Sequence, residues 1–451
     1  MTDLEALEAV EICAGAGGQA LGIERAGFEH ALAVELDASA CDTLRANRPG
    51  WKIAEGDAAD RQVWNPQDYA GIALLAGGVP CPPFTVAGRR LGAADERDLF
   101  AWAVELCRVI RPRALLLENV RGLSEARFGA YRQHVLDRLR ELGYVPGWRL
   151  LNACDYGVPQ LRPRFVLVAL RPADARWFRW PAPAGGPPLT VGEALADLMG
   201  ARGWPGAARW ARGANRVAPT IVGGSKKHGG GDLGPTRAKR AWAELGVDGL
   251  GIADQAPGPA DDPALAPRLT CEMVARLQGW RDEWGWQFTG RKTARYRQLG
   301  NAFPPPVAQA VGTAIRRALR HEAGPGNPDG PDGSRPDDAA ETAHVGDPVY
   351  AVLRSHPEFL TVSQIAAATA AGMAGVVTAG LAAAGATPAG VPGASPAEVL
   401  RRVRHLSQDF EVEVAEIRGE PAYRLGQFKA FLGQHDHARH QRFLAARTKI
   451  S

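Results

Sequence analysis

Short aliphatic runs alternate with segments of helical periodicity over the first 170 residues. Between the runs, apolar residues recur at the three- and four-residue spacing of a helix. The alternation is typical of a doubly wound α/β sheet. Predicted strands occupy residues 10–13, 31–35, 51–54, 72–77, 114–118 and 164–170. Predicted helices occupy residues 19–27, 38–46, 98–110 and 128–142.

The pattern changes after residue 170. Residues 171–268 are dominated by Pro, Gly, Trp and Arg with poor periodicity, and helical patterns return at 270–280 and 307–320. Residues 321–343 carry six acidic residues against one arginine among glycines and prolines, which indicates a linker. The chain is therefore divided into five parts. They are a first domain (1–180 and 268–320), an insertion (181–267), the linker (321–343), a small domain (344–432) and a tail (433–451).

The small domain has a pattern of its own. Helices are predicted at 347–355, 363–372 and 375–384, and a fourth begins at Ser395, with Pro396 in its first turn and Glu398 completing a capping box. Two alternating strands, FEVEV (410–414) and AYRLG, follow it. This order resembles a winged-helix DNA-binding domain. The alternative is a helical interaction or dimerisation module whose basic face is merely solvated; that face carries Arg401, Arg402, Arg404 and His405.

Composition excludes several classes of protein. Hydrophobic residues make up 45% and charged residues 23%, as in soluble globular domains. No apolar run approaches a membrane span, and the acidic N-terminus does not resemble a signal peptide, so a cytoplasmic protein is expected. The six cysteines form no C-x-x-C pair, which argues against disulfides and against a metal site. Residues 200–243 carry nine Lys or Arg against one acid, which favours a polyanionic partner.

Three points along the predicted sheet indicate an adenosine-containing ligand. The turn AGAGG (14–18) joins the first strand to a helix, where absent side chains let a ligand approach the backbone. Glu35 follows Gly15 by twenty residues, the spacing at which an acid binds ribose hydroxyls. Asp57 ends the third strand, where it is expected to meet an adenine amino group.

The loop after the fourth strand contains a candidate nucleophile. Cys81 lies among Pro80, Pro82 and Pro83, so we expect its thiol to be presented rather than packed. A lone cysteine is otherwise a small buried hydrophobe, and that interpretation is kept for Cys41, Cys107, Cys154 and Cys271. Lowering the pKa of a thiol needs nearby positive charge, which the same loop supplies at Arg89, Arg90 and Arg97.

Charged residues also end later strands. Glu118 closes an otherwise apolar strand, so burial should raise its pKa and suit it to proton donation. Arg162 and Arg164 are two residues apart and are expected on one face of a strand, where two guanidinium groups can hold a carbonyl or a phosphate. The alternative for this pair is a solvated strand edge.

In order along the chain, AGAGG, VELD, GD, GGVPCPPF, ENV, QLRPR and YRQLGNAFPPPVA resemble the motifs of the DNA (cytosine-5) methyltransferases. The match covers about 1–170 and 268–320. It implies a Rossmann-like sheet, S-adenosylmethionine as methyl donor, double-stranded DNA as substrate and a target-recognition region inserted before GNAFPPP. Two departures concern cofactor binding and loop contacts: Cys13 replaces an aromatic residue of the family, and PCPPFT, with Pro82 and Thr85, replaces PCQPFS.

The resemblance implies roles for individual residues. Cys81 attacks carbon 6 of a flipped cytosine, Glu118 stabilises or protonates N3, and Arg164 with Arg162 holds O2. Asn301 is expected near the catalytic loop. The implied cofactor-binding residues are Cys13, Gly15, Gly17, Gly18, Glu35, Leu36, Asp57 and Asn301. The expected DNA-binding residues are Arg97, Arg216, Lys226, Lys227, His228 and Arg237.

Two other functions remain open on this sequence. One is a tRNA cytosine-5 methyltransferase, and the other is a non-catalytic DNA-binding regulator on the same fold. The basic insertion and the extra domain favour duplex DNA over tRNA. The presence of Cys81, Glu118 and Arg164 together favours an enzyme. A cognate restriction endonuclease encoded nearby, not necessarily bound to this chain, is the further partner to expect.

Overall fold

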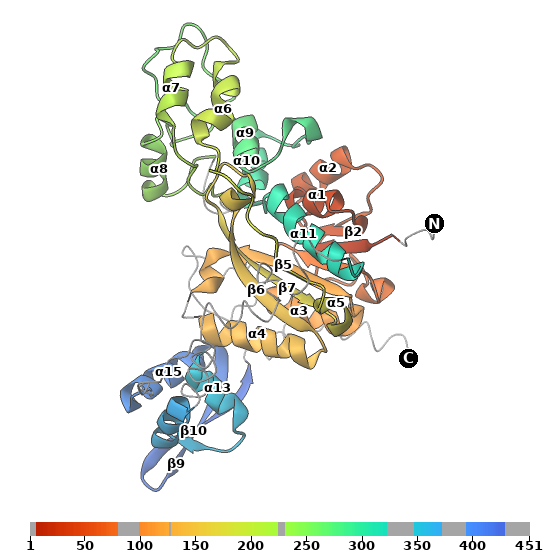
Figure 1. Cartoon of the computed structure of the whole chain (residues 1–451), viewed down its shortest axis with the longest axis vertical. Coiled ribbons are helices and arrows are strands. Elements are labelled where there is room, and N and C mark those ends of the chain that lie inside the picture. The colour runs from red at the N-terminus through yellow and green to blue at the C-terminus, as the bar shows by residue number, and fades with distance from the viewer. Residues whose placement is uncertain are drawn as a thin grey trace. The chain divides into compact units, whose positions relative to one another are not determined.

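The computed structural model describes residues 6–79, 99–125, 128–223, 231–322, 347–371 and 394–428 (Figure 1). The chain divides into two compact units. The first comprises Met1–Val79, Leu106–Arg121 and Gly143–Ala339, and the second comprises Pro80–Glu105, Gly122–Leu142 and Ala340–Ser451. The predicted first domain therefore contributes residues to both units.

The first unit contains a seven-stranded sheet in the order β3-β2-β1-β4-β5-β7-β6. Neighbours from β3 to β5 pair in parallel, whereas β7 is antiparallel to both β5 and β6. This confirms the predicted α/β class. The strands are β1 Glu8–Ile12, β2 Glu29–Glu35, β3 Ile53–Glu55, β4 Leu74–Gly77, β5 Ala114–Val120, β6 Val145–Asn152 and β7 Pro163–Leu170.

The sequence pattern missed β6. Its segment VPGWRLLN contains a proline and a glycine, which weaken a strand pattern. Tertiary pairing with β7 over eight residue pairs supplies the order that the local pattern lacks. The other six strands lie where aliphatic runs predicted them, because strands covered on both faces are continuously apolar.

Helices α1 and α11 contact each other and pack on the sheet through one apolar cluster. Gly22 allows this close approach, since a methyl group there would lie 2.5 Å from the Ala308 side chain. The parallel strands all end at one edge, where the functional residues predicted on β1, β2, β3 and β5 gather. The helices beside the sheet are α1 Gly18–Arg25, α2 Ala38–Asn47, α3 Leu99–Ile110, α5 Pro172–Ala175 and α11 Pro305–Leu319.

The insertion shares an apolar core with the segment that follows it, and sequence periodicity did not reveal this core. The helices of the insertion are short, and large tryptophans rather than a repeating stripe fill the interior; Trp204, Trp210 and Trp242 are buried together with Trp280 of the following segment. Contacts of α6 with α7 and α9, and of α9 with α10, join the insertion to the segment that follows it (Figure 1). These helices are α6 Val191–Gly200, α7 Ala207–Gly213, α8 Thr236–Ala243, α9 Cys271–Leu277 and α10 Lys292–Asn301.

The second unit joins α4, Gly129–Glu141, to the C-terminal domain. Arg354 donates to Glu141 at 2.6 Å, and the His134 ring meets Phe410 edge-on. Burial lowers the pKa of His134 to about 3, with Arg354 and Arg138 adding to the effect. The C-terminal elements are α13 Pro348–Ser355, β8 Leu360–Thr361, helical residues 362–371, α15 Pro396–Asp409, β9 Phe410–Ile417 and β10 Glu420–Phe428.

The C-terminal elements form an antiparallel sheet in the order β8-β10-β9. Ser395 caps α15 as predicted, because its side chain accepts from the Glu398 amide at 3.3 Å. The Glu398 side chain accepts from Arg402 at 3.1 Å instead of completing the predicted capping box. The helix predicted at 375–384 lies outside the described residues. Within the described residues, no helix is long and apolar enough to cross a membrane. The same residues contain no group of three or more His, Cys, Asp or Glu side chains that could hold a metal ion.

Candidate active site

The glycine turn and Glu35 meet at the carboxyl edge of the sheet. Gly15 donates its amide to Glu35 Oε2 at 2.7 Å, and Asp37 donates its amide to Oε1 at 2.7 Å. Burial raises the pKa of Glu35, although these amide contacts oppose the shift. A methyl group on Gly15 would meet nothing within 4 Å among the described residues, so open space lies above the turn. The acid is thus held beside the space where a nucleoside would lie.

Trp286 supports this turn from the other side, and sequence reasoning missed it. Its Nε1 donates to the Ala16 carbonyl at 3.1 Å. Gly17 has φ +91°, and a Cβ atom there would lie 2.5 Å from the Trp286 ring. Glycine is therefore required at residue 17 both by backbone conformation and by the adjacent ring. Gly18 is required by close approach to the Phe303 carbonyl.

The remaining predicted cofactor residues surround the same edge. Cys13 adopts φ +52° where the chain leaves β1. Leu36 is 65% exposed directly after Glu35, which leaves an apolar face available to a planar ring. Asp57 Oδ1 accepts from the Ala59 amide at 3.0 Å, and Asn301 ends α10 beside Gly223. Open space over the turn, a held acid and an exposed apolar side chain together fit S-adenosylmethionine.

Glu118 and Arg164 form a buried ion pair at the end of β5. Arg164 Nε lies 2.7 Å from Glu118 Oε1, with each side chain 10% exposed. Strand pairing explains this, because β5 and β7 run antiparallel and place Val120 opposite Arg164. Burial raises the pKa of Glu118, while Arg164 and Arg162 oppose the shift. A carboxyl group whose pKa is raised by burial takes up a proton more readily than an exposed one.

Arg162 does not share a strand face with Arg164, which corrects the sequence prediction. Strand β7 begins at Pro163, and Arg162 precedes it with φ +20°. The Arg162 side chain is fully buried and donates to the carbonyls of Ile221 at 2.7 Å, Gly300 at 2.8 Å and Ala302 at 2.7 Å. Its guanidinium thus ties three distant backbone segments together.

Gln160 makes a similar connection that the sequence did not indicate. Its Nε2 donates to the Leu277 carbonyl at 3.0 Å and to Gln278 Oε1 at 2.8 Å. Its Oε1 accepts from the Ile221 amide at 2.8 Å. The QLRPR motif therefore joins the insertion to α9 and to the Gly300–Ala302 segment.

The predicted DNA-binding residues of the insertion are described only in part. Arg216 forms an exposed ion pair with Glu244 at 2.9 Å, and Arg237 is exposed on α8. The structure does not bring these two arginines into one site with Glu118. Lys226, Lys227 and His228 lie outside the described residues, as do Cys81 and Arg97.

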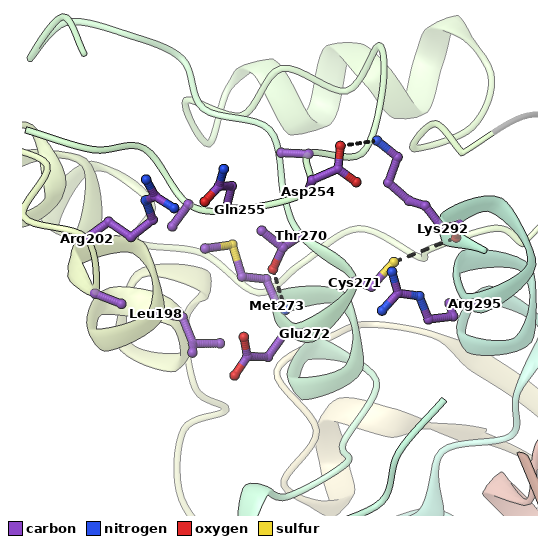
Figure 2. A pocket seen from close by; sticks show the side chains of 13 residues that line it. Leu198, Arg202, Asp254, Gln255, Thr270, Cys271, Glu272, Met273, Lys292 and Arg295 are labelled. Atoms are coloured by element: carbon purple, nitrogen blue, oxygen red, sulfur yellow. Dashed lines mark hydrogen bonds and ion pairs between the residues drawn. The ribbon is translucent and has the colours of Figure 1, made fainter. Parts of the chain in front are cut away.

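A cavity of about 300 Å³ lies between α6, α9, α10 and the segment around Asp254, and Figure 2 shows the side chains that line it. Lys292 pairs with Asp254 across it at 3.0 Å, and the Cys271 thiol lies 3.7 Å from the Lys292 carbonyl. Burial raises the pKa of Cys271, in keeping with a packed rather than a reactive cysteine. The cavity lies where the insertion meets α9 and α10 of the following segment.

A glycine turn held by an acid at the carboxyl edge of a parallel sheet is the arrangement of nucleotide-binding α/β proteins. The family model "C-5 cytosine-specific DNA methylase" matches residues 7–317. The chain belongs to this family: it is a DNA (cytosine-5) methyltransferase that uses S-adenosylmethionine. The description of the family names DNA as the substrate.

Named relatives extend the match. The chain is 56% identical over 448 residues to the type II methyltransferase M.NaeI of Lentzea aerocolonigenes, covering 99% of this chain and 100% of the relative. It is 49% identical over 316 residues to M.NgoMIV of Neisseria gonorrhoeae, covering 69% of this chain and 98% of that relative. M.Eco47II of Escherichia coli is 35% identical over 339 residues, covering 69% of this chain and 79% of the relative.

Proposed function

We propose that this chain methylates one cytosine within a specific duplex sequence through a covalent adduct between Cys81 and the base. The observation that carries the proposal is the Glu118–Arg164 pair, 2.7 Å apart and buried at the carboxyl edge of β5. Cytosine carbon 5 is a weak nucleophile until attack on carbon 6 interrupts the aromatic ring. The base must leave the duplex before any thiol can reach it.

Residues of this chain perform the addition to the base. The Cys81 thiolate forms a bond to carbon 6 while Glu118 passes its proton to N3, so the electron pair reaches carbon 5. Arg164 holds the Glu118 carboxylate and the oxygen O2 of the base. Bound S-adenosylmethionine supplies the methyl group. Loss of the carbon 5 proton to a base then expels Cys81 and restores the ring.

Bisulfite sequencing of DNA from cells that express the chain tests this function. We expect one methylated cytosine in a fixed sequence context. The Cys81→Ser variant should abolish methylation while keeping cofactor affinity, and Glu118→Gln should lower the rate by orders of magnitude with cofactor affinity retained. Substantial turnover by Cys81→Ser would exclude the covalent mechanism. A defect of Glu118→Gln confined to cofactor binding would remove Glu118 from the base pocket.

We propose that the insertion, residues 181–267, selects the target sequence. Its basic residues and the exposed Arg237 on α8 support this, since arginine reads guanine edges in the major groove. Exchanging this segment for that of M.NgoMIV, with both parent proteins as controls, should transfer the methylated sequence. A chimera that is active on the original sequence would contradict the assignment.

We further propose that the chain is the modification enzyme of a type II restriction–modification system. The names of its relatives support this, because they are type II methyltransferases. An extract of the source cells should cleave an unmethylated copy of the target sequence and spare a methylated one. Equal cleavage of both copies, or of neither, would refute the pairing.

The C-terminal domain is proposed to be a winged-helix-like module that adds DNA affinity. Its order of elements supports this, as does the exposed face of α15, where Arg401 is 77% exposed and Arg404 is exposed. Arg401→Ala with Arg404→Ala should weaken DNA binding and reduce the salt slope by about 0.9 for each phosphate that the variant no longer neutralises. Arg424→Ala, which removes an arginine paired with Glu413, is the matched control. Unchanged affinity and slope would favour a protein partner instead.

A further inference from the structure

The cavity whose lining Figure 2 shows has the size of a small-molecule site and a charged wall. Its volume of about 300 Å³ is at the lower end of the range for pockets that bind small ligands. A cavity that only reflects imperfect packing is lined by apolar side chains. This one is instead lined by charged residues from several elements, namely Arg202, Asp254, Glu272, Lys292 and Arg295.

Ion pairs inside the protein neutralise only part of this charge. Lys292 pairs with Asp254 at 3.0 Å. The side chains of Arg202, Glu272 and Arg295 form no hydrogen bond or ion pair with any residue that the structure describes. Arg295 is half-buried, and its Nε atom is buried without an acceptor among those residues. A buried N–H group without an acceptor is unfavourable, so we expect a bound acceptor in the working state.

The two unpaired arginines reach the cavity from different helices. Arg202 follows α6, whereas Arg295 lies on α10, and Figure 2 shows both guanidinium groups directed toward the cavity between them. Two like charges on the wall of one cavity repel each other, and an anion between them removes the repulsion. Guanidinium groups match the oxygen atoms of a phosphate, and two of them balance the nearly two negative charges of a phosphate monoester.

Glu272 indicates what the rest of the ligand carries. It lies on α9 in the same wall and is exposed, so a ligand can reach it from solvent. A carboxylate accepts hydrogen bonds and repels a second anion, so the ligand groups beside it must be donors such as hydroxyls. The backbone of DNA has phosphodiesters but no hydroxyl donors. The acid therefore favours a small hydroxylated molecule over the DNA backbone.

We propose that this cavity binds the phosphate monoester of a small hydroxylated molecule, with Arg202 and Arg295 on the phosphate and Glu272 on the hydroxyl groups. The site is distinct from the candidate active site, because neither Glu35 nor the Glu118–Arg164 pair lines the cavity. A bound ligand contacts the insertion through Arg202 and the following segment through α9 and α10. It should therefore stabilise the folded protein as its concentration rises.

Isothermal titration of the full-length protein, without cofactor or DNA, tests the proposal with three probes. They are ribose 5-phosphate, inorganic phosphate and ribose. We expect saturable binding of both phosphates in the millimolar range or below, with ribose 5-phosphate bound more tightly, and no binding of ribose. A wild-type protein that binds neither phosphate would overturn the proposal.

Two variants test the arginines directly. Arg202→Gln and Arg295→Gln should each weaken the binding of ribose 5-phosphate at least about tenfold, the contribution of one hydrogen bond to a charged group. Both should fold like the wild type, because neither side chain has a hydrogen-bond or ion-pair partner among the described residues. Arg212→Gln is the matched control, since it removes an exposed arginine of α7 that does not line the cavity. Affinity that is unchanged in both cavity variants would show that the arginines are merely solvated.

A third variant tests the hydroxyl side of the site. Glu272→Ala removes both the acceptor and its negative charge, so the preference for ribose 5-phosphate over inorganic phosphate should become smaller. An unchanged preference would refute the role of Glu272.

A competition experiment separates the two sources of a phosphate. Repeating the wild-type titration in the presence of saturating duplex DNA should leave the affinity for ribose 5-phosphate unchanged. Displacement by the duplex would assign the site to the DNA backbone and overturn the small-molecule proposal. Methylation of DNA is scored separately, so a failure of the cytosine chemistry would not be mistaken for a failure of this cavity.

Discussion

Replacing Arg162 with methionine should destabilise the protein more than any change to its neighbour Arg164. Arg162 is fully buried and donates to three carbonyls, those of Ile221, Gly300 and Ala302, at 2.7–2.8 Å. Methionine has a comparable length and fills much of the space. It can donate to none of the three oxygens, so all of them are left without a donor in a region closed to water.

The magnitude follows from two opposing effects. Hydrogen bonds to a charged group contribute about 1.5–3 kcal/mol each, so three of them contribute roughly 5–9 kcal/mol. Removing a buried guanidinium also removes its desolvation penalty, which is several kcal/mol. The net loss in the free energy of unfolding should therefore be roughly 3–5 kcal/mol, the range found when one member of a buried polar group is removed.

Urea unfolding followed by tryptophan fluorescence measures this loss, because the core that these carbonyls adjoin contains several buried tryptophans. Arg164→Met is the matched control. Its guanidinium pairs with Glu118 at 2.7 Å. That variant should lose methyl transfer with a smaller change in stability, because the unpaired Glu118 carboxyl can take up a proton whereas the three carbonyls cannot. A stability loss below about 1 kcal/mol for Arg162→Met would refute the argument that Arg162 holds the three segments together.

Three further predictions use other parts of the structure. Gly17→Ala should lower the affinity for S-adenosylhomocysteine at least about tenfold in a titration. Residue 17 has φ +91°, and a Cβ atom there would lie 2.5 Å from Trp286. Affinity equal to that of the wild type would show that the turn tolerates a side chain. Glu11→Gln should stabilise the protein more at pH 8 than at pH 4.5. Burial raises the pKa of Glu11 above its ordinary value of 4.5, so the wild-type protein loses stability as the pH rises from that ordinary value through the raised one. Urea midpoints at the two pH values decide this, and a gain that grows toward low pH would contradict the sign. Gln160→Leu should lower the free energy of unfolding in urea by about 2–4 kcal/mol, because the Ile221 amide, the Leu277 carbonyl and the Gln278 side chain each lose a hydrogen bond. A neutral effect would mean that these groups find other partners.

Local patterns in the sequence determined the parallel part of the sheet. Residues in strands and helices repeat at spacings of two to four, so neighbouring residues carry the information. The apolar runs of β4 and β5 and the helix cap at Ser395 all appear where the sequence predicted them. Strand β6 and the short helices of the insertion were missed, because long-range pairing and tryptophan packing, not periodicity, order them.

The tertiary structure decided which polar residues of the candidate site meet. Gly15 and Glu35 could be paired from sequence, since their twenty-residue spacing corresponds to one strand–helix–strand unit. Arg162 could not be interpreted in this way, because its acceptors at Ile221 and Ala302 lie 59 and 140 residues away. Trp286 reaches the glycine turn across 270 residues. Such contacts depend on where separate segments cross in space, and a local pattern of residues carries no record of that crossing.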